Sequence, residues 1–232
     1  MKTLAIEQST RTGSVALLGG EDIAGEMQWE NENLRSQAIF SAIPEILSDA
    51  AWTIGDVDLF AVGLGPGSFA GVRTALAAAE GFAMVDRKPI LGIGSGEAIA
   101  ADLFEADHEG PIAVVGDARR QRVWVAVFER GKNSPRQRVP YTLMTAEQLK
   151  QTLAETGSVA TPDWDRIGDL LAKSLGASTE LVRQPCVPSA TTIGRLAIAA
   201  LSPGTSLPLP QPIYLHPAVF VKPKYPRIRG SI

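Results

Sequence analysis

The chain of 232 residues contains one cysteine, Cys186, and only two histidines, His108 and His216. A single cysteine cannot form an intramolecular disulfide, so the sequence favours a reducing compartment, and we expect a cytoplasmic protein. Neither histidine has a second one a helical turn away, the spacing at which two imidazoles share a helix face and bind a metal. The sequence therefore predicts no metal site built on histidine and cysteine.

Long apolar runs are also missing. The first one, Leu4-Ala5-Ile6, ends at Glu7 and is too short for the core of a signal peptide. The most apolar stretch, residues 61–85, contains Arg73, Glu80 and a Gly-Pro-Gly break. Each of those charges would cost roughly 2.5–3.5 kcal/mol in the middle of a bilayer. We therefore expect no contact with a membrane.

Acidic residues are absent after Glu180, although the net charge of −3 gives no general reason to expect nucleic-acid binding. The basic residues beyond it are Arg183, Arg195, Lys222, Lys224, Arg227 and Arg229. Seven prolines between Pro203 and Pro226 exclude a regular helix. We expect a proline-rich basic tail outside the core, which is either solvated or in contact with an acidic partner or a phosphate backbone.

What the chain does have is the run Gly65–Arg73, which reads GPGSFAGVR and follows the apolar residues 59–62. It predicts a buried strand, a tight turn and a helix whose N-cap is Ser68. A glycine loop at a helix N-terminus can hold an anion. The Gly-Lys-Ser/Thr ending of a phosphate-binding loop is absent, so a strand-to-helix connection is the better-supported interpretation.

The helix expected over residues 68–85 carries only two charges, Arg73 and Glu80. A helix resting on a sheet needs a single apolar stripe, and this one is apolar or small on nearly every side. We expect another protein surface to cover it. One candidate face is Gly71, Ala75, Ala78 and Phe82; a second is Ala70, Thr74, Ala77 and Gly81.

Periodicity and breakers predict strands followed by helices in each half of the chain. In the first half we expect strands at 3–7, 14–18, 23–29, 57–64 and 90–93, and helices at 34–51, 68–85 and 96–104. In the second half we expect strands at 112–115 and 123–128, a loop at 131–137, and helices at 145–153 and 189–201. A further strand and helix are expected within 163–175. The predicted lobes are residues 1–104 and 105–232.

These motifs, in this order, resemble the bacterial TsaB (YeaZ) family, the non-catalytic partner in making threonylcarbamoyladenosine on tRNA. The family's signature loop is matched by Gly65, Pro66, Gly67, Ser68, Phe69 and Arg73, with Ala70 where threonine is usual. Other matching segments are Leu4–Thr10, Pro89–Ala98, Asp117–Arg120, Pro188–Ala190 and Pro212–Leu215. A histidine common before the first helix is missing from Leu34–Gln37.

The resemblance implies a two-lobed actin/hexokinase/Hsp70-like (ASKHA) α/β fold with duplicated βββαβα units. It implies a scaffold without cofactors that binds a TsaD-type catalytic subunit, recruits a TsaE-type ATPase and meets tRNA through the complex. The helices 34–51 and 68–85 would form the partner interface. Its expected residues are Leu34, Ala38, Ile39, Ala42, Gly71, Thr74, Ala75, Ala78 and Phe82.

Two other function classes stay open: a small-molecule kinase of the same superfamily and a homodimeric regulatory protein. Glu7, Ser9 and Thr10 occupy the first hairpin turn, where such kinases place a carboxylate and hydroxyls around Mg²⁺ and phosphate, so weak nucleotide contact is conceivable. The second lobe has Asp117-Ala118-Arg119-Arg120 in place of a glycine/threonine phosphate turn. It also has a single glycine, Gly168, where a pair would contact adenosine. We therefore expect no catalytic residues.

Overall fold

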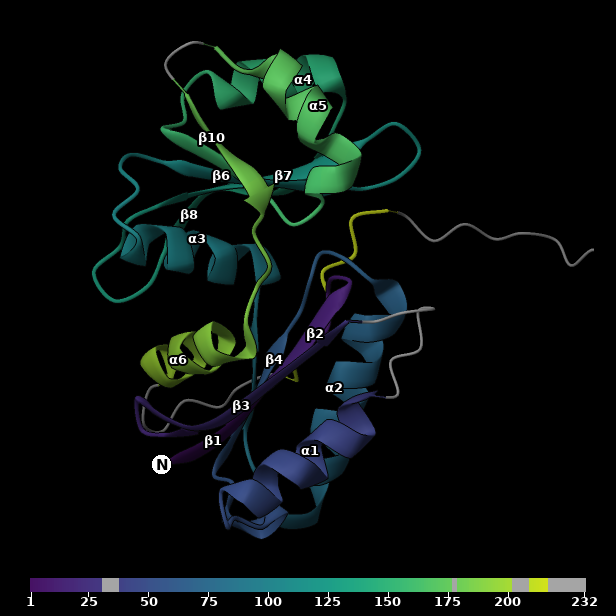
Figure 1. The fold of residues 1–232 in the computed structure, drawn as a ribbon, viewed down its shortest axis with the longest axis vertical. Helices are drawn as coiled ribbons and strands as arrows, with labels where there is room; N and C mark the ends of the chain where they lie inside the picture. The colour runs from purple at the N-terminus through teal and green to yellow at the C-terminus, as the bar shows by residue number, and fades with distance from the viewer. Residues whose placement is uncertain (31–37, 177–178, 202–208, 217–232) are drawn as a thin grey trace, which may run out of the picture.

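Two five-stranded sheets, one in each lobe, form the framework of the computed structural model, which describes residues 1–30, 38–176, 179–201 and 209–216 (Figure 1). The first sheet has the order β3-β2-β1-β4-β5 and the second the order β10-β9-β6-β7-β8. The strands of the first sheet are β1 (Lys2–Glu7), β2 (Thr12–Gly19), β3 (Asp22–Glu30), β4 (Leu59–Gly63) and β5 (Ile90–Ile93). Those of the second are β6 (Ile112–Asp117), β7 (Val123–Glu129), β8 (Arg136–Met144), β9 (Ser158–Thr161) and β10 (Glu180–Pro185).

Six α-helices are described. They are α1 (Ala38–Asp49), α2 (Phe69–Asp86), α3 (Ser95–Glu105), α4 (Ala146–Leu153), α5 (Trp164–Ser174) and α6 (Ala190–Ala200). A short 3₁₀ turn, η2 (Ile54–Asp56), precedes β4. Side-chain caps begin three of the helices. Ser68, the cap that the sequence predicted for α2, accepts from the Gly71 amide, Thr145 accepts from the Gln148 amide and Ser189 from the Thr192 amide.

The two halves repeat one topology. In each, three antiparallel strands are followed by a helix, a parallel strand, a second helix, a further parallel strand and a third helix. Both sheets have the same strand order when counted within their own half. The predicted βββαβα unit is therefore present twice, and each copy continues with one more strand and helix.

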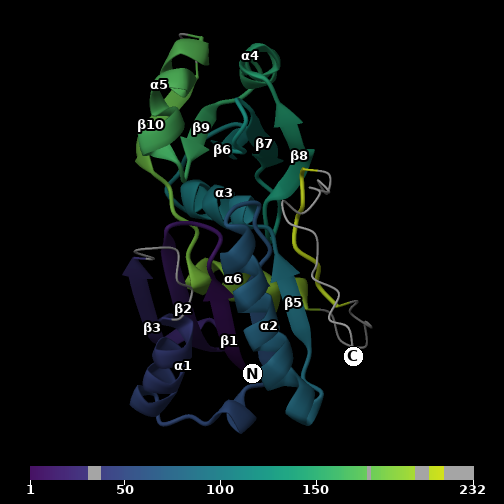
Figure 2. The same cartoon turned by 90° about the vertical axis from the view of Figure 1, so that its right-hand side faces the viewer.

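The last helix of each half belongs to the junction between the lobes. Helix α6, from the second half, packs through Ile193 and Leu196 on the first sheet, against Ala5 and Leu18. Helix α3, from the first half, packs through Ile99 and Phe104 on the second sheet and also contacts α6. The crossing places α3 and α6 between the lobes, as Figures 1 and 2 show. The boundary between residues 104 and 105 stays a prediction.

Three strands of the second sheet were not foreseen. Strand β9 comes just before residues 163–175, where a strand and a helix were expected; that segment contains α5 and no strand, so the expected strand there is wrong. Part of the expected loop 131–137 and the residues after it form β8, and the segment before α6 forms β10. Both lie at the edges of the second sheet, where side chains are mostly exposed and the apolar alternation is weak. Pro140 in β8 fits an edge strand, because an edge position can do without the amide donor that proline lacks.

The tail differs from the expectation in part. Residues 209–216 do not project into solvent but run in extended form along the two lobes, where Leu215 packs partly buried on the second-lobe core (Figure 2). The expected helical residue Leu34 and the basic residues from Lys222 onward lie outside the described residues.

Candidate functional site

The signature loop Gly65–Arg73 connects β4 to α2 and is docked on the turn that follows β1. The Ser68 amide donates to the Ser9 carbonyl oxygen at 2.6 Å, and the Gly71 amide donates to the Ser68 hydroxyl at 3.2 Å. A Cβ on Gly67 would lie 2.1 Å from the Ser9 oxygen. The loop amides and glycines thus serve close packing within the chain, as the strand-to-helix interpretation predicted.

Glu7 lies under this loop and is fully buried. One carboxylate oxygen accepts from the Ser9 amide at 2.5 Å and the other from the Ser95 hydroxyl at 2.7 Å. The Ser95 hydroxyl in turn accepts from the Gly65 amide at 3.1 Å. Burial raises the pKa of Glu7, although these hydrogen bonds oppose the rise. Glu7 therefore links the turn after β1, the signature loop and the start of α3.

The hydroxyls beside Glu7 have different environments. Thr10 donates from its hydroxyl to the Thr12 carbonyl oxygen at 2.8 Å, which closes the turn. Ser9 is buried beside Glu7, and no group among the described residues meets its hydroxyl at normal hydrogen-bond geometry. Contact of Glu7, Ser9 and Thr10 with a nucleotide stays a prediction. The carboxylate expected to face Mg²⁺ is engaged inside the protein.

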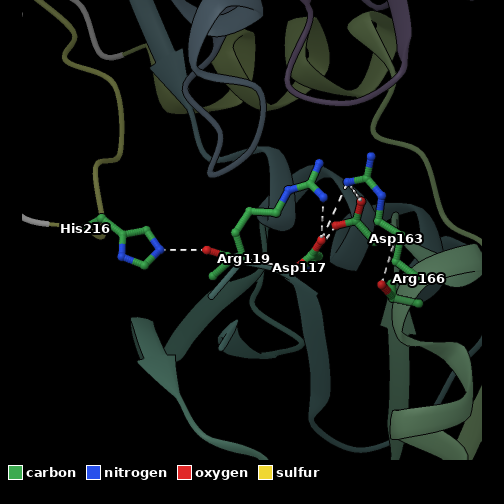
Figure 3. A network of polar contacts seen from close by, with 7 residues as sticks. Asp117, Arg119, Asp163, Arg166 and His216 are labelled. Carbon is green, nitrogen blue, oxygen red and sulfur yellow. Dashed lines mark hydrogen bonds and ion pairs between the residues drawn. The ribbon is translucent and has the colours of Figure 1, made fainter. Parts of the chain in front are cut away.

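The corresponding turn of the second lobe follows β6 and is held by ion pairs between aspartates and arginines (Figure 3). The Asp117 amide donates to the Asp163 carboxylate at 2.9 Å, and the Asp117 carboxylate lies 3.4 Å from Arg119 and 3.7 Å from Arg166. Burial raises the pKa of Asp163. Arg119 has a φ of 63°, as part of three consecutive left-handed residues. The arginines fill the turn with bulk and pair with its carboxylates.

Neither histidine joins a cluster of metal ligands. The Nδ1 atom of His108 lies 3.1 Å from the Ser158 hydroxyl and 3.3 Å from the Glu180 carboxylate, and His216 Nε2 lies 2.7 Å from the Ala118 carbonyl oxygen. Across the described ranges no group of three or more His, Cys, Asp or Glu side chains is placed to hold a metal ion. The same residues include no helix long and apolar enough to cross a membrane.

The predicted partner-interface residues of α1 and α2 divide by burial. Five are buried within the chain itself: Ile39, Ala42, Gly71, Ala75 and Ala78. Three are half-buried: Ala38, Thr74 and Phe82. A partner helix cannot reach Ala75 and Ala78, because they pack in the same core cluster as α1 and the sheet. The expectation that the Gly71–Ala75–Ala78 side faces a partner therefore does not fit this structure.

The exposed side of α2 is the other small-residue face. Ala70, Ala77 and Gly81 are exposed and Thr74 is half-buried. Large apolar side chains on these two helices are also exposed to solvent: Phe40 (58%) on α1, and Met84 (75%) and Val85 (81%) at the end of α2. The two small-residue faces differ in burial: the face with Ala75 and Ala78 is buried, and the face with Ala77 and Gly81 is exposed. A helical wheel groups the residues of each face but cannot tell which face is buried.

A second exposed cluster lies at the N-terminus of α2. The Arg73 guanidinium stacks 3.9 Å from the Phe69 ring centroid, and its Nε donates to the Tyr214 hydroxyl at 2.6 Å. Phe69 and Tyr214 lie with ring centroids 5.6 Å apart. The two signature residues Phe69 and Arg73 are thus held by a residue from the C-terminal segment, a contact that the sequence did not predict.

The sequence of this chain matches a known protein family and several of its members. The sequence model of the family described as TsaD, tRNA N6-adenosine threonylcarbamoyltransferase, matches residues 32–167, more than half of the chain. The tRNA threonylcarbamoyladenosine biosynthesis protein TsaB of Haemophilus influenzae is 34% identical over 132 residues, 56% of this chain and 54% of the relative. TsaB of Escherichia coli K12 is 28% identical over 133 residues, 57% of each. The chain belongs to the TsaB (YeaZ) family.

Sequence coverage within the TsaB family is partial: the chain spans just over half the length of these two relatives. A longer match, 65% of each chain at 30% identity, is to TsaB of Bacillus subtilis. The structure described as YeaZ from Pseudomonas aeruginosa superposes with a TM-score of 0.76 at 21% identity, over 92% of this chain and 99% of that one. This match confirms the predicted two-lobed ASKHA-like α/β fold.

Proposed function

We propose that this chain is the non-catalytic partner of a TsaD-type subunit in the synthesis of threonylcarbamoyladenosine on tRNA. The relatives' names supply the pathway. The observation that carries the partner role is the exposed side of α2, where Ala77, Gly81, Met84 and Val85 face solvent beside the exposed charges Arg73 and Glu80. Exposed apolar side chains gathered on one helix face support an interaction site.

Helices α1 and α2 form the proposed contact, with Ala70, Thr74, Ala77 and Gly81 at its centre. Small side chains let a partner helix approach the backbone of α2 closely, while Phe40 and Met84 offer larger apolar area at the edges. Ala38 and Phe82 are half-buried, and Phe82 stacks on Phe60 in the core, so neither is placed at the centre of the contact. The assembled pair would recruit a TsaE-type ATPase and act on tRNA in the cytoplasm.

The absence of catalysis by this chain is supported by the two turns. Glu7 has no exposed surface, and both of its carboxylate oxygens accept hydrogen bonds from the protein. Asp117 is paired with two arginines. Stabilising a transition state needs donors or charges that point at the reacting group. The Glu7 and Asp117 carboxylates instead point at partners within their own lobes.

Light scattering after gel filtration tests the proposal. An equimolar mixture with a TsaD-type subunit should elute as one species whose mass is the sum of both chains. The chain alone reports whether the same surface pairs with a second copy, as the homodimeric alternative requires. Two unchanged peaks from the mixture, with the chain alone a dimer, would overturn the partner role and favour that alternative.

A further inference from the structure

The extended segment 209–216 makes specific contacts with the first lobe. The Ile213 amide donates to the Leu64 carbonyl oxygen, at the end of β4, with a distance of 3.0 Å. Pro210 packs on Gly92 in the edge strand β5, where an added Cβ would lie 2.7 Å from the proline Cβ. The edge of the first sheet is thereby covered by this segment (Figure 2).

Tyr214 adds a third contact with the first lobe. Its hydroxyl accepts from Arg73 Nε at 2.6 Å, and its ring lies beside Phe69 at the start of α2. A hydrogen bond to a charged donor is among the stronger kinds in proteins. The segment is therefore attached to a helix as well as to the sheet.

The next two residues contact the second lobe. Leu215 is partly buried and packs against the core cluster that joins α3 to the second sheet and contains Phe104 and Trp124. His216 Nε2 lies 2.7 Å from the carbonyl oxygen of Ala118, in the turn after β6 (Figure 3). Within four residues, from Ile213 to His216, the chain passes from hydrogen bonds with one lobe to contacts with the other.

We propose that residues 209–216 form a strap that fixes the angle between the two lobes. Folds with two lobes change shape by hinge motion, in which a few backbone positions between the lobes absorb the rotation. A segment joined to both lobes opposes such a rotation, because its contacts with one of them must break. The strap contains the Pro212–Leu215 segment, whose residues Ile213, Tyr214 and Leu215 make contacts described above. The inference concerns the chain alone and does not rest on the proposed partner.

Electron spin resonance distance measurements test the strap. Nitroxide labels are placed at Glu45→Cys in α1 and Lys150→Cys in α4, both exposed, in full-length protein carrying Cys186→Ala. The strap variant combines Ile213→Pro, which removes the donor to Leu64, with Tyr214→Ala and His216→Ala. The distribution of distances between the two labels should be about twice as wide in this variant as in the protein with the native strap.

Leu209→Ala is the matched control, because Leu209 belongs to the same segment but is 71% exposed. It should leave the distribution unchanged. Identical distributions for the strap variant and the native strap, with unchanged circular dichroism, would show that the segment does not restrain the lobes.

Amide hydrogen exchange on the native chain needs no variant and remains decisive if the strap variant does not fold. The Ile213 amide should exchange at least about tenfold more slowly than in an unstructured peptide, because its hydrogen bond to Leu64 must open first. Exchange at the rate of an unstructured peptide would overturn the strap.

Discussion

Gly71 faces the carbonyl oxygen of Gln8 so closely that a methyl group on Gly71 would lie 2.0 Å from that oxygen. The start of α2 and the turn after β1 are thus in backbone-to-backbone contact, which a side chain at this position would prevent. Gly67 stands in the same relation to Ser9. Two glycines of the signature loop are therefore explained by packing inside the first lobe rather than by a ligand.

Gly71→Ala should destabilise the chain by about 1–3 kcal/mol, because the contact with Gln8 is to backbone that cannot rotate away. Gly81→Ala in the same helix is the control: nothing lies within 4 Å of its added methyl, and alanine is favoured over glycine there by about 1 kcal/mol. Thermal unfolding of both variants checks the prediction. Equal melting temperatures for the two would contradict it.

Ala77→Arg should weaken binding of a TsaD-type subunit by at least tenfold, about 1.4 kcal/mol, without lowering the melting temperature, since Ala77 is exposed. Ala78→Arg should instead lower the melting temperature, because Ala78 is only 8% exposed and lies in the core. Calorimetric titration and thermal unfolding separate the two effects. Gln151→Arg, exposed on α4, controls for added charge. Native affinity in the Ala77 variant would remove this face from the interface.

Glu97 should make the stability of the chain depend on pH. Burial raises its pKa from 4.5 to about 6, so the folded state binds more protons than the unfolded state between these values. The stabilisation is complete below pH 4.5 and is lost as the pH rises through about 6. Glu97→Gln removes this dependence and should raise stability at pH 7 by up to about 2 kcal/mol.

Urea unfolding at a series of pH values measures the effect. Asp102, whose pKa burial also raises to about 6, keeps a slope of the same sign in the variant. Glu80→Gln, an exposed change on α2, controls for the loss of one carboxylate. A profile for Glu97→Gln that superposes on the native one would refute the assignment.

The purified chain should not hydrolyse ATP. The Glu7 carboxylate is fully buried and each of its oxygens already accepts a hydrogen bond, so it is not available as a ligand for a magnesium ion. Phosphate release over hours measures this. Steady hydrolysis that disappears in Thr10→Ala, with circular dichroism unchanged in the variant, would support the kinase alternative instead.

The sequence was informative where local chemistry decides the structure. Ser68 was recognisable as a helix cap, and most buried strands followed from apolar runs such as Leu59–Val62. Strand β8 was missed because Arg136, Arg138 and Pro140 interrupt the alternation that marks a strand. On an edge those side chains remain solvated.

The faces of α2 illustrate the limit of one-dimensional patterns. Both small-residue faces have similar composition, and only the position of α1 and the sheet determines that Ala78 is buried and Ala77 exposed. The contact between Arg73 and Tyr214 joins residues 141 positions apart and has no local signal. Such long-range pairs depend on the path of the whole chain.

Formation of threonylcarbamoyladenosine on tRNA tests the central claim most directly. A TsaD-type subunit, a TsaE-type ATPase, a source of threonylcarbamoyl-adenylate and tRNA are incubated with and without this chain, and the modified nucleoside is measured by mass spectrometry. We expect product only when the chain is added, much less with Ala77→Arg, and none from the chain without the TsaD-type subunit. Equal product with and without the chain, or product from the chain and tRNA alone, would contradict the account.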